Sequence, residues 1–265
     1  MVLNDKVNDR GNIGEYKRTD LYEKVADISK RSFEIYAEKI GADHFYSDEQ
    51  ITTAATDHST ALLYECLRVV YDPMFDQYDN VLFADTDIVV NTEDNIFDLM
   101  EGDVMGVLES DIVTSHGGGY NGWDGNADTY AAYVRKFTFH DAPLVPAMPP
   151  ENRPSKLTIM NTGIVVWSRE ARLRAREVFD DWYTWFTTGP QEHQSIMNDQ
   201  PYLSAQFMKH DFDVQTISQV WNDSPHYNTE DEFFQIAKMC HYTGGDWKID
   251  MIRHYNEKKF KIFEK

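Results

Sequence analysis

The chain has 265 residues, of which 42% are hydrophobic, so it can bury a substantial core in one large domain or two small ones. Its 25 Lys and Arg residues against 45 Asp and Glu residues leave a formal net charge of -20, which disfavours nucleic acid and anionic membranes as partners unless the basic residues cluster. The two distant cysteines suggest no disulfide framework. The sequence has no signal-peptide core and no apolar run of bilayer length. We therefore expect a soluble, cytoplasmic protein, either a bacterial or viral protein or a cytosolic one.

The first part of the chain alternates between predicted strands and predicted helices. Strands are predicted over residues 1–3, 43–46 and 103–108 and within the stretch 81–90, and helices over residues 20–40, 59–71 and 95–100. Gly41 and Pro73 are the stop signals of the first two helices. This alternation predicts an α/β fold with a largely parallel sheet, in which ligands gather at the carboxyl ends of the strands.

The stretch VLFADTDIVV, residues 81–90, carries the first chemical signal. Short apolar runs rich in β-branched residues flank an Asp-Thr-Asp triplet, which indicates a buried strand that ends at the acids. If the strand continues through the triplet, Asp85 and Asp87 point to the same face. Two neighbouring carboxylates repel each other, and a divalent cation would neutralise them. The alternative is a strand that ends in an acidic turn, although apolar residues resume at Ile88.

Residues 110–155 differ in composition from the rest of the chain. They contain GGGYNGWDGN and APLVPAMPPENRP, and this density of Gly, Pro and aromatic residues indicates a long irregular excursion. Tyr120 and Trp123 would belong to a flexible lid or an acceptor platform. A loosely packed surface insertion explains the same composition equally well.

The next strand, predicted over residues 157–167, contains a polar Asn-Thr-Gly in the apolar run LTIMNTGIVVW. Asn161 needs a hydrogen-bond partner there, and Gly163 would let a hydroxyl-rich ligand approach the backbone. A β-bulge with a satisfied asparagine is the alternative. Ser168 then caps a helix predicted over residues 170–186.

Two further polar groups follow near the end of the chain. Asp199 and Gln200 precede a predicted helix, where acids are often only capping residues. His241 lies in CHYTGGDWK, where it would complete a metal site begun by two carboxylates, and Lys248 is suited to meet a phosphate as a point charge. The segment 250–265 is predicted to pack as a last helix.

These features occur in a fixed order: DxD after a strand, NTG within a strand, DQ before a helix, and HxxG with a nearby lysine. In this order they resemble the retaining glycosyltransferases of the GT-A fold, most nearly the family of glycogenin and the bacterial galactosyltransferases. The likeness runs from about Tyr22 to Lys248 and leaves out the excursion. It implies a Rossmann-like, mostly parallel sheet flanked by helices, in a single domain over residues 1–265 with an insertion or lid at 110–155 and a C-terminal segment at 250–265.

The resemblance also implies an activity: transfer of a sugar from a nucleotide-sugar, expected to be a UDP-sugar, to an acceptor hydroxyl with retained configuration. Asp85, Asp87 and His241 would hold Mn²⁺ or Mg²⁺, and this ion would coordinate the diphosphate of the donor. Lys248 would contact the same diphosphate, although it comes one residue later than in the usual spacing.

The remaining roles implied by the resemblance concern the two substrates. Asn161, Asp199 and Gln200 would surround the donor sugar and the acceptor. The first predicted strand is short and atypical for the family. Asn4 and Tyr16 are therefore assigned to the nucleotide base only because they lie near this strand in the sequence. The acceptor is left open: a glycan, a protein, a lipid-linked sugar or a modified base would each supply a hydroxyl.

Two other functions fit parts of the sequence. Four apolar residues followed by DxDxV match the aspartate-nucleophile phosphatases, but that motif normally lies near the start of the chain. Such phosphatases also need a second acidic pair later in the chain, and here the pair Asp180-Asp181 lies on a predicted helix. A binding module for nucleotide-sugars or glycans would keep the fold without turnover.

Overall fold

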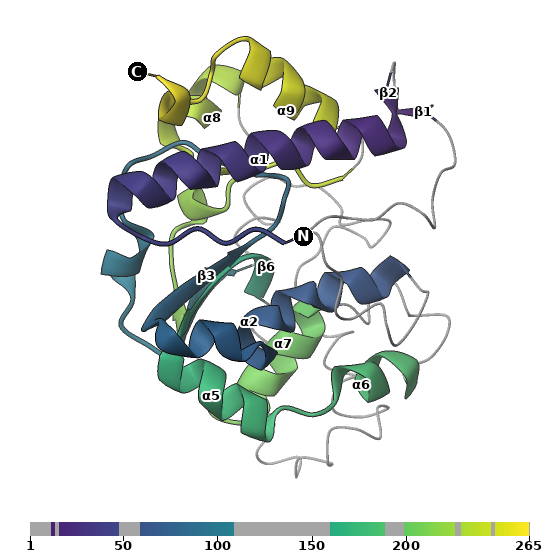
Figure 1. The fold of residues 1–265 in the computed structure, drawn as a ribbon, viewed down its shortest axis with the longest axis vertical. Coiled ribbons are helices and arrows are strands. Elements are labelled where there is room, and N and C mark those ends of the chain that lie inside the picture. The colour runs from purple at the N-terminus through teal and green to yellow at the C-terminus, as the bar shows by residue number, and fades with distance from the viewer. Residues whose placement is uncertain are drawn as a thin grey trace. The chain divides into compact units, whose positions relative to one another are not determined.

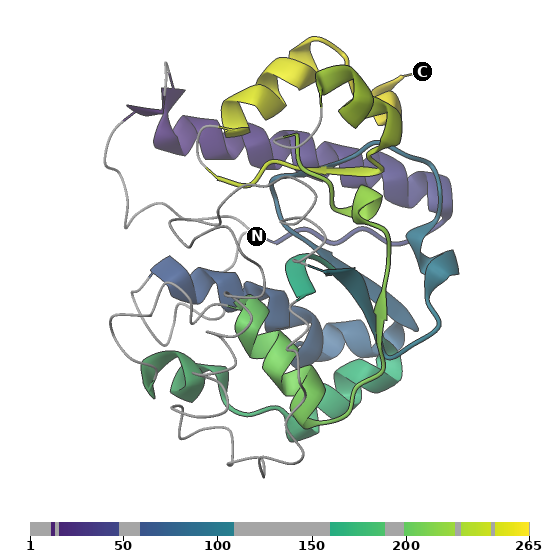
Figure 2. The same cartoon turned by 180° about the vertical axis from the view of Figure 1, so that it is seen from behind.

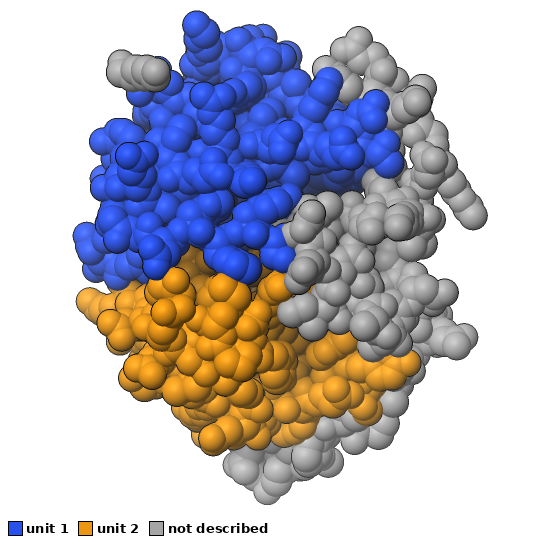
Figure 3. Space-filling model, in the orientation of Figure 1, with its two compact units in different colours: residues 1–50, 84–99, 218–265 blue, residues 51–83, 100–217 orange. Residues whose placement is uncertain are grey.

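The computed structural model describes residues 12–13, 16–47, 59–108, 160–188, 199–225, 229–244 and 247–264 (Figure 1). The strand predicted at residues 1–3, the excursion at 110–155 and Asn4 therefore lie outside the described residues. The chain forms two compact units, one from residues 1–50, 84–99 and 218–265 and the other from residues 51–83 and 100–217 (Figure 3). The single domain over residues 1–265 stays a prediction.

The first unit is built around helix α1, Arg18–Ile40. Its other elements are β1 (Asn12–Ile13), β2 (Tyr16–Lys17), β4 (Ile88–Val90), η5 (Ile96–Leu99), η9 (Gln219–Trp221), α8 (Glu230–Ile236), β8 (Met239–His241), α9 (Trp247–Asn256) and η10 (Lys261–Phe263), where η denotes a 3₁₀ helix. Strands β1 and β2 pair antiparallel, and so do β4 and β8. Helices α8 and α9 lie along the same side of α1 in both views (Figures 1 and 2).

Helix α1 confirms the helix predicted over residues 20–40. Its buried face carries Val25, Ile28 and Tyr36 at helical spacing. The helix ends at Gly41, whose φ of 70° is the left-handed conformation that favours glycine after a helix. The Tyr36 hydroxyl donates to the carbonyl of Asp94 at 2.7 Å, so the helix is tied to the segment that follows β4. The strand predicted at 43–46 is wrong, because residues 42–47 have no regular secondary structure.

The second unit contains a four-stranded sheet in the order β3-β6-β5-β7. Its elements are η3 (Ser59–Leu67), α2 (Arg68–Tyr71), η4 (Pro73–Gln77), β3 (Asn80–Ala84), β5 (Val104–Leu108), β6 (Met160–Ser168), α5 (Arg169–Val178), α6 (Trp182–Thr188), α7 (Asp199–Lys209) and β7 (Val214–Thr216). The helices contribute to one core with the strands, which includes Val70, Val104, Val165, Trp167, Ala171, Trp185, Leu203 and Phe207. This arrangement confirms the α/β class.

The sheet is mixed, because β5 pairs with β7 in parallel and with β6 antiparallel. The β5–β6 register shifts between Gly106 and Val107, which face Val165 and Asn161. The Asn-Thr-Gly segment therefore lies in a bulge of β6. Asn161 Oδ1 accepts a hydrogen bond from the Gly163 amide at 2.9 Å, so the bulge alternative describes the local structure.

The helix predicted over residues 170–186 is divided into α5 and α6. Ser168 caps α5 as expected, since its hydroxyl accepts from the Ala171 amide at 3.1 Å. Phe179 leaves the helix with a ψ of 138° and packs its ring against Phe212, 5.4 Å away. Asp181 then caps α6 through the Thr184 amide at 2.7 Å. Packing of the half-buried Phe179 against aromatic rings outweighs the helical pattern, and the pair Asp180-Asp181 lies between the helices instead of on one.

Among the helices that the structure describes, none has both the length and the apolar character needed to cross a membrane.

Glu230, the first residue of α8, makes a network that depends on pH. Its carboxylate lies 3.1 Å from both Arg253 Nη1 and Lys259 Nζ. Burial alone would raise the pKa of Glu230, but the hydrogen bonds from Lys259 and Arg253 outweigh it and lower the pKa to about 2. A carboxylate with a lowered pKa stabilises the fold above its unfolded pKa, and this stabilisation is lost as the pH falls toward 2.

We therefore expect Glu230→Gln to destabilise the protein by at most about 1 kcal/mol at pH 7, since the group is partly exposed. The difference in free energy of unfolding between Glu230→Gln and the wild type, measured by urea unfolding, should become smaller between pH 5 and pH 3. Glu23→Gln, at an exposed position of α1, is the control and should have no effect. A difference that stays constant with pH would contradict this role.

Candidate metal centre

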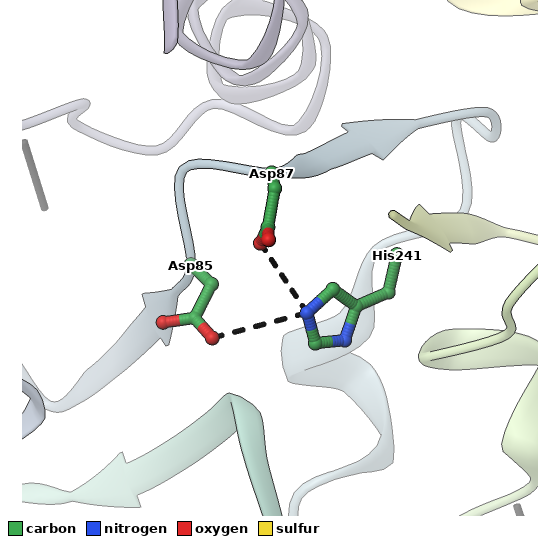
Figure 4. A group of neighbouring side chains, drawn as sticks. All are labelled: Asp85, Asp87 and His241. Atoms are coloured by element: carbon green, nitrogen blue, oxygen red, sulfur yellow. Dashed lines mark ion pairs between the residues drawn. The ribbon is translucent and has the colours of Figure 1, made fainter. Parts of the chain in front are cut away.

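The predicted strand that ends at the acids is confirmed by β3, which ends at Ala84, but the strand does not continue through the triplet, because Asp85–Asp87 form a turn between β3 and β4. The Ile88 amide donates to the carbonyl of Asp85 at 3.3 Å, as in a β-turn. In a continuous strand the two acids would be held about 7 Å apart along one face. The turn lets both carboxylates face one point (Figure 4).

His241 reaches the same point because β8 pairs with β4. Ile88 lies opposite His241 in the antiparallel register, and the Tyr242 amide donates to the carbonyl of Asp87 at 2.9 Å. The backbone that follows the acidic turn is thereby joined to the backbone around the histidine. All three residues belong to the first unit.

The three side chains form a compact group of metal-ligand type. The imidazole Nε2 of His241 lies 3.3 Å from Asp87 Oδ1 and 3.9 Å from Asp85 Oδ2. One ligand atom from each residue lies within 4.8 Å of the others. His241 is buried, with 6% of its side chain exposed, whereas Asp85 remains 27% exposed and so open to an incoming ion. Figure 4 shows the two carboxylates pointing toward the imidazole ring.

The two carboxylates of the group differ in their electrostatic surroundings. Burial raises the pKa of Asp85 to about 6, and the charge of Asp87 contributes to the rise. Burial alone would also raise the pKa of Asp87, but Lys248 and His241 outweigh it and hold this pKa well below its usual range. Burial disfavours the imidazolium of His241, yet the charge of Asp87 raises the pKa of that ring. The site therefore favours a cation close to both carboxylates.

Lys248 supplies part of this charge. Its ammonium donates to Asp87 Oδ2 at 2.7 Å and to the carbonyls of Tyr242 at 3.2 Å and Gly244 at 3.4 Å. It also lies 5.4 Å from the centre of the Tyr22 ring. An ammonium has three N–H donors, and three acceptors surround this one. Asp87 thus presents one oxygen to Lys248 and the other to His241.

The donor set fits a divalent cation. The three ligand atoms lie within 4.8 Å of one another, so modest side-chain movements would let one ion contact all of them. Carboxylate oxygens suit Mg²⁺ and Mn²⁺, and an imidazole nitrogen is more typical of transition metals than of Mg²⁺. The chemistry of the three groups therefore fits Mn²⁺ better than Mg²⁺.

The other predicted site residues lie in the second unit or have undescribed side chains. Asn161 is in β6 and is 6% exposed, and Asp199, the first residue of α7, is also 6% exposed. The Ser204 hydroxyl accepts from the Met160 amide and donates to the Gln200 carbonyl, which joins β6 to the first turn of α7. Tyr16 lies in β2 of the first unit, and its base-binding role stays a prediction.

Gln200 has an unusual feature within this second group. Its side-chain Nε2 is buried, and no hydrogen-bond partner is found for it in the described part of the chain. A buried amide without a partner is costly, so a hydroxyl from a ligand is a suitable acceptor.

Two contacts of the metal group were not predicted from the sequence. The side-chain oxygen Oδ1 of Asn222 lies 2.8 Å from His241 Nδ1, and the Tyr22 ring lies near Lys248. Neither residue belongs to a motif with a known spacing. Only the pairing of distant segments brings them to the site, so no local pattern could have identified them.

Comparison with known proteins places these observations in a family. The model of glycosyl transferase family 8 matches residues 16–248. A search of curated proteins gave no match. A solved structure described as a glycosyltransferase involved in the glycosylation of the major capsid of PBCV-1 is similar over 88% of this chain and 92% of that chain, with 13% identity and a TM-score of 0.50. The bifunctional WbbM apo structure is similar over 79% of this chain and 36% of that chain, with 15% identity and a TM-score of 0.39.

The family match spans most of the chain and includes Lys248 and the three residues of the metal group. It confirms the likeness to the glycogenin and galactosyltransferase family, and it favours a transferase over an aspartate-nucleophile phosphatase. The α/β architecture and the first of the two solved structures agree with a fold of the GT-A type. The chain belongs to glycosyl transferase family 8.

Proposed function

We propose that this protein transfers a sugar from a UDP-sugar to an acceptor hydroxyl, with Mn²⁺ at Asp85, Asp87 and His241 and with retention of the anomeric configuration. The observation that carries the proposal is the convergence of two carboxylates and one imidazole, with ligand atoms within 4.8 Å of one another. Family membership supports the transferase chemistry. The bound ion would supply Lewis-acid stabilisation to the leaving diphosphate.

The chain's own residues have distinct roles in this proposal. Lys248 is placed to stabilise negative charge on the diphosphate, because its ammonium adjoins Asp87 at the metal group. Its three donors are already engaged, so a phosphate oxygen would replace one acceptor. The longest contact, 3.4 Å to the carbonyl of Gly244, is the weakest and the easiest to exchange.

The transfer step needs groups near the anomeric carbon. In the proposed front-face displacement the bond from this carbon to the diphosphate oxygen breaks, and the electron pair stays on the diphosphate. The acceptor oxygen forms its bond on the same face, and its proton passes to the leaving diphosphate. We assign Asn161, Asp199 and Gln200 to the surroundings of the donor sugar and acceptor, and the unpartnered Gln200 Nε2 supports the assignment. Asn4 and Tyr16 are proposed to contact the nucleotide base.

Thermal unfolding against a panel of UDP-, GDP-, ADP- and TDP-sugars, each with and without Mn²⁺, tests this function. A ligand that binds only the folded state stabilises it by about 2.7 kcal/mol at a hundredfold excess over its Kd. We expect stabilisation by a UDP-sugar that requires Mn²⁺ and is removed by a chelator. Indifference to every nucleotide-sugar in the presence of Mn²⁺ would reject the proposal.

The stereochemical part has a separate test. NMR of the sugar first released from the donor, or of the first transferred product, should show the anomeric configuration of the donor. An inverted anomer would reject retention and leave the metal-dependent transfer standing.

A further inference from the structure

Asn222 lies against the face of the metal group that is turned away from the carboxylates. Its Oδ1 is 2.8 Å from His241 Nδ1, on the side of the ring opposite Nε2. Asn222 is 1% exposed and His241 is 5% exposed, so water is excluded from this contact. The asparagine thus holds the buried edge of the imidazole, while the other ring nitrogen faces Asp85 and Asp87.

The backbone fixes this contact from both sides of Asn222. The Lys238 amide donates to the carbonyl of Val220 at 2.7 Å, and the Asp223 amide donates to the carbonyl of Met239 at 3.0 Å. The His241 amide then donates to the carbonyl of Asp223 at 2.7 Å. These bonds align the segment around Asn222 with β8, so the asparagine is held opposite the histidine.

A cation–π contact holds the same segment. Trp221, which is 3% exposed, has the ammonium of Lys238 4.5 Å from the centre of its ring. Asn222 and its neighbours are therefore rigid, as a residue that orients a ligand must be.

The chemistry of the contact determines the state of the ring. An amide carbonyl oxygen accepts hydrogen bonds and has no proton to donate, so Nδ1 of His241 must carry the proton. In a neutral imidazole the lone pair then lies on Nε2, which is the nitrogen directed at the carboxylates. Metal-binding histidines commonly have such a partner on the second nitrogen, and its loss typically weakens metal binding 10- to 100-fold.

We propose that Asn222 is a positioning residue that sets the tautomer and the orientation of His241 for the divalent cation. The inference rests on the metal role proposed above for Asp85, Asp87 and His241. It adds a fourth residue that contacts neither ion nor substrate and acts only through the imidazole.

The test compares two substitutions by titrating Mn²⁺ into the purified protein and following free Mn²⁺ by electron paramagnetic resonance. Asn222→Leu has a similar volume and no acceptor, and we expect its Kd for Mn²⁺ to rise 10- to 100-fold. Asn222→Asp keeps an acceptor oxygen at Nδ1, and its Kd should stay within about threefold of the wild type. Equal affinity of Asn222→Leu and the wild type would overturn the proposal, as would a large loss of affinity in a folded Asn222→Asp.

Asn91→Leu is the matched control. Asn91 is another buried asparagine of the same unit, and its amide donates to the carbonyls of Phe234 and Ala237 at 3.3 and 3.0 Å. Its removal should lower the Tm without changing the Mn²⁺ affinity of the folded protein. An equal loss of affinity in Asn91→Leu and Asn222→Leu would mean that destabilisation alone explains the effect, and the proposal would fail.

A measurement on the wild type decides the case if the substitutions prevent folding. Long-range ¹⁵N–¹H NMR of ¹⁵N-histidine protein identifies which nitrogen of the neutral His241 ring carries the proton, with the signal assigned by its absence in His241→Gln. A proton on Nδ1 is expected, and a proton on Nε2 would overturn the inference. Failure of the wild type to bind Mn²⁺ would instead reject the metal role, so the two failures are distinguishable.

Discussion

Asp87→Asn is expected to abolish both Mn²⁺ binding and sugar transfer, with a loss of activity of at least about a thousandfold. A Lewis acid contributes roughly several kcal/mol to the stabilisation of a leaving group, and each 1.4 kcal/mol corresponds to about a factor of ten in rate. The substitution keeps the shape of the side chain and removes its charge. Transfer from the donor and Mn²⁺ affinity, measured on the same preparation, test the expectation.

The same substitution should also lower the Tm, because Asp87 is the carboxylate that pairs with the buried Lys248 at 2.7 Å. Removing one partner of a buried pair leaves the other charge uncompensated. Asp85→Asn separates the two effects. It removes a metal ligand but also removes the repulsion between Asp85 and Asp87, so metal binding should be lost without a fall in the Tm of the metal-free protein.

Asp98→Asn is the control for both variants. Asp98 is exposed in η5 of the same unit and accepts a hydrogen bond from the Asn95 side chain at 3.0 Å. It should change neither Mn²⁺ affinity nor activity. Full activity of Asp87→Asn in the presence of Mn²⁺ would contradict the role given to the metal group.

The second large effect concerns stability and lies in the second unit. Arg172 of α5 is completely buried, and its guanidinium donates to the carbonyls of Trp167 at 3.0 Å, Phe75 at 2.9 Å and Tyr78 at 2.6 Å. The side chain thus joins β6 and η4 to α5. Burial lowers the pKa of Arg172, although the charge of Asp76 opposes this.

We expect Arg172→Met to destabilise the protein by about 3 kcal/mol. Methionine fills much of the volume, but the carbonyls of Trp167, Phe75 and Tyr78 each lose the hydrogen bond from the guanidinium, while Phe75 keeps a second donor, the Tyr78 amide. A buried carbonyl left without a donor costs about 1–3 kcal/mol. The removal of a buried charge offsets part of this cost. Arg172→Lys should recover less than half of the lost free energy of unfolding, because an ammonium holds its donors on one atom and does not reproduce the fork of the planar guanidinium. The measurement is the free energy of unfolding in urea.

Arg169→Met is the matched control on the same helix, since Arg169 is exposed. Its free energy of unfolding should stay within about 0.5 kcal/mol of the wild type. A similar effect at Arg169 and Arg172 would show that charge or helix propensity, and not the bonds to the carbonyls, explains the loss.

Local patterns predicted the features that depend on neighbouring residues. The helical spacing of Val25, Ile28 and Tyr36 predicted α1, because burial of one face requires that period. Ser168 was identified as a cap because its hydroxyl needs only an amide three residues later. The order of the DxD, NTG, DQ and HxxG groups predicted the glycosyltransferase family, which the family match confirms.

Tertiary contacts decided the features on which these patterns were silent or misleading. The apolar runs on both sides of the triplet left open a strand that continues through Asp85 and Asp87, yet a turn forms there, and the pairing of β4 with β8 brings His241 to both carboxylates. The helical pattern ran past Phe179, but α5 ends there, where the ring of this half-buried residue packs against Phe212. In both places a long-range interaction outweighed a local preference.

The metal group depends on both the sequence and the tertiary structure. The sequence by itself determined the ligand types and the candidates, since carboxylates and an imidazole are recognisable from their chemistry. Only the antiparallel pairing of Ile88 with His241 brings the imidazole to the acids, and only the segment beside β8 brings Asn222 to the imidazole. Hydrogen bonds between distant strands depend on the whole chain being folded, so no pattern of neighbouring residues contains them.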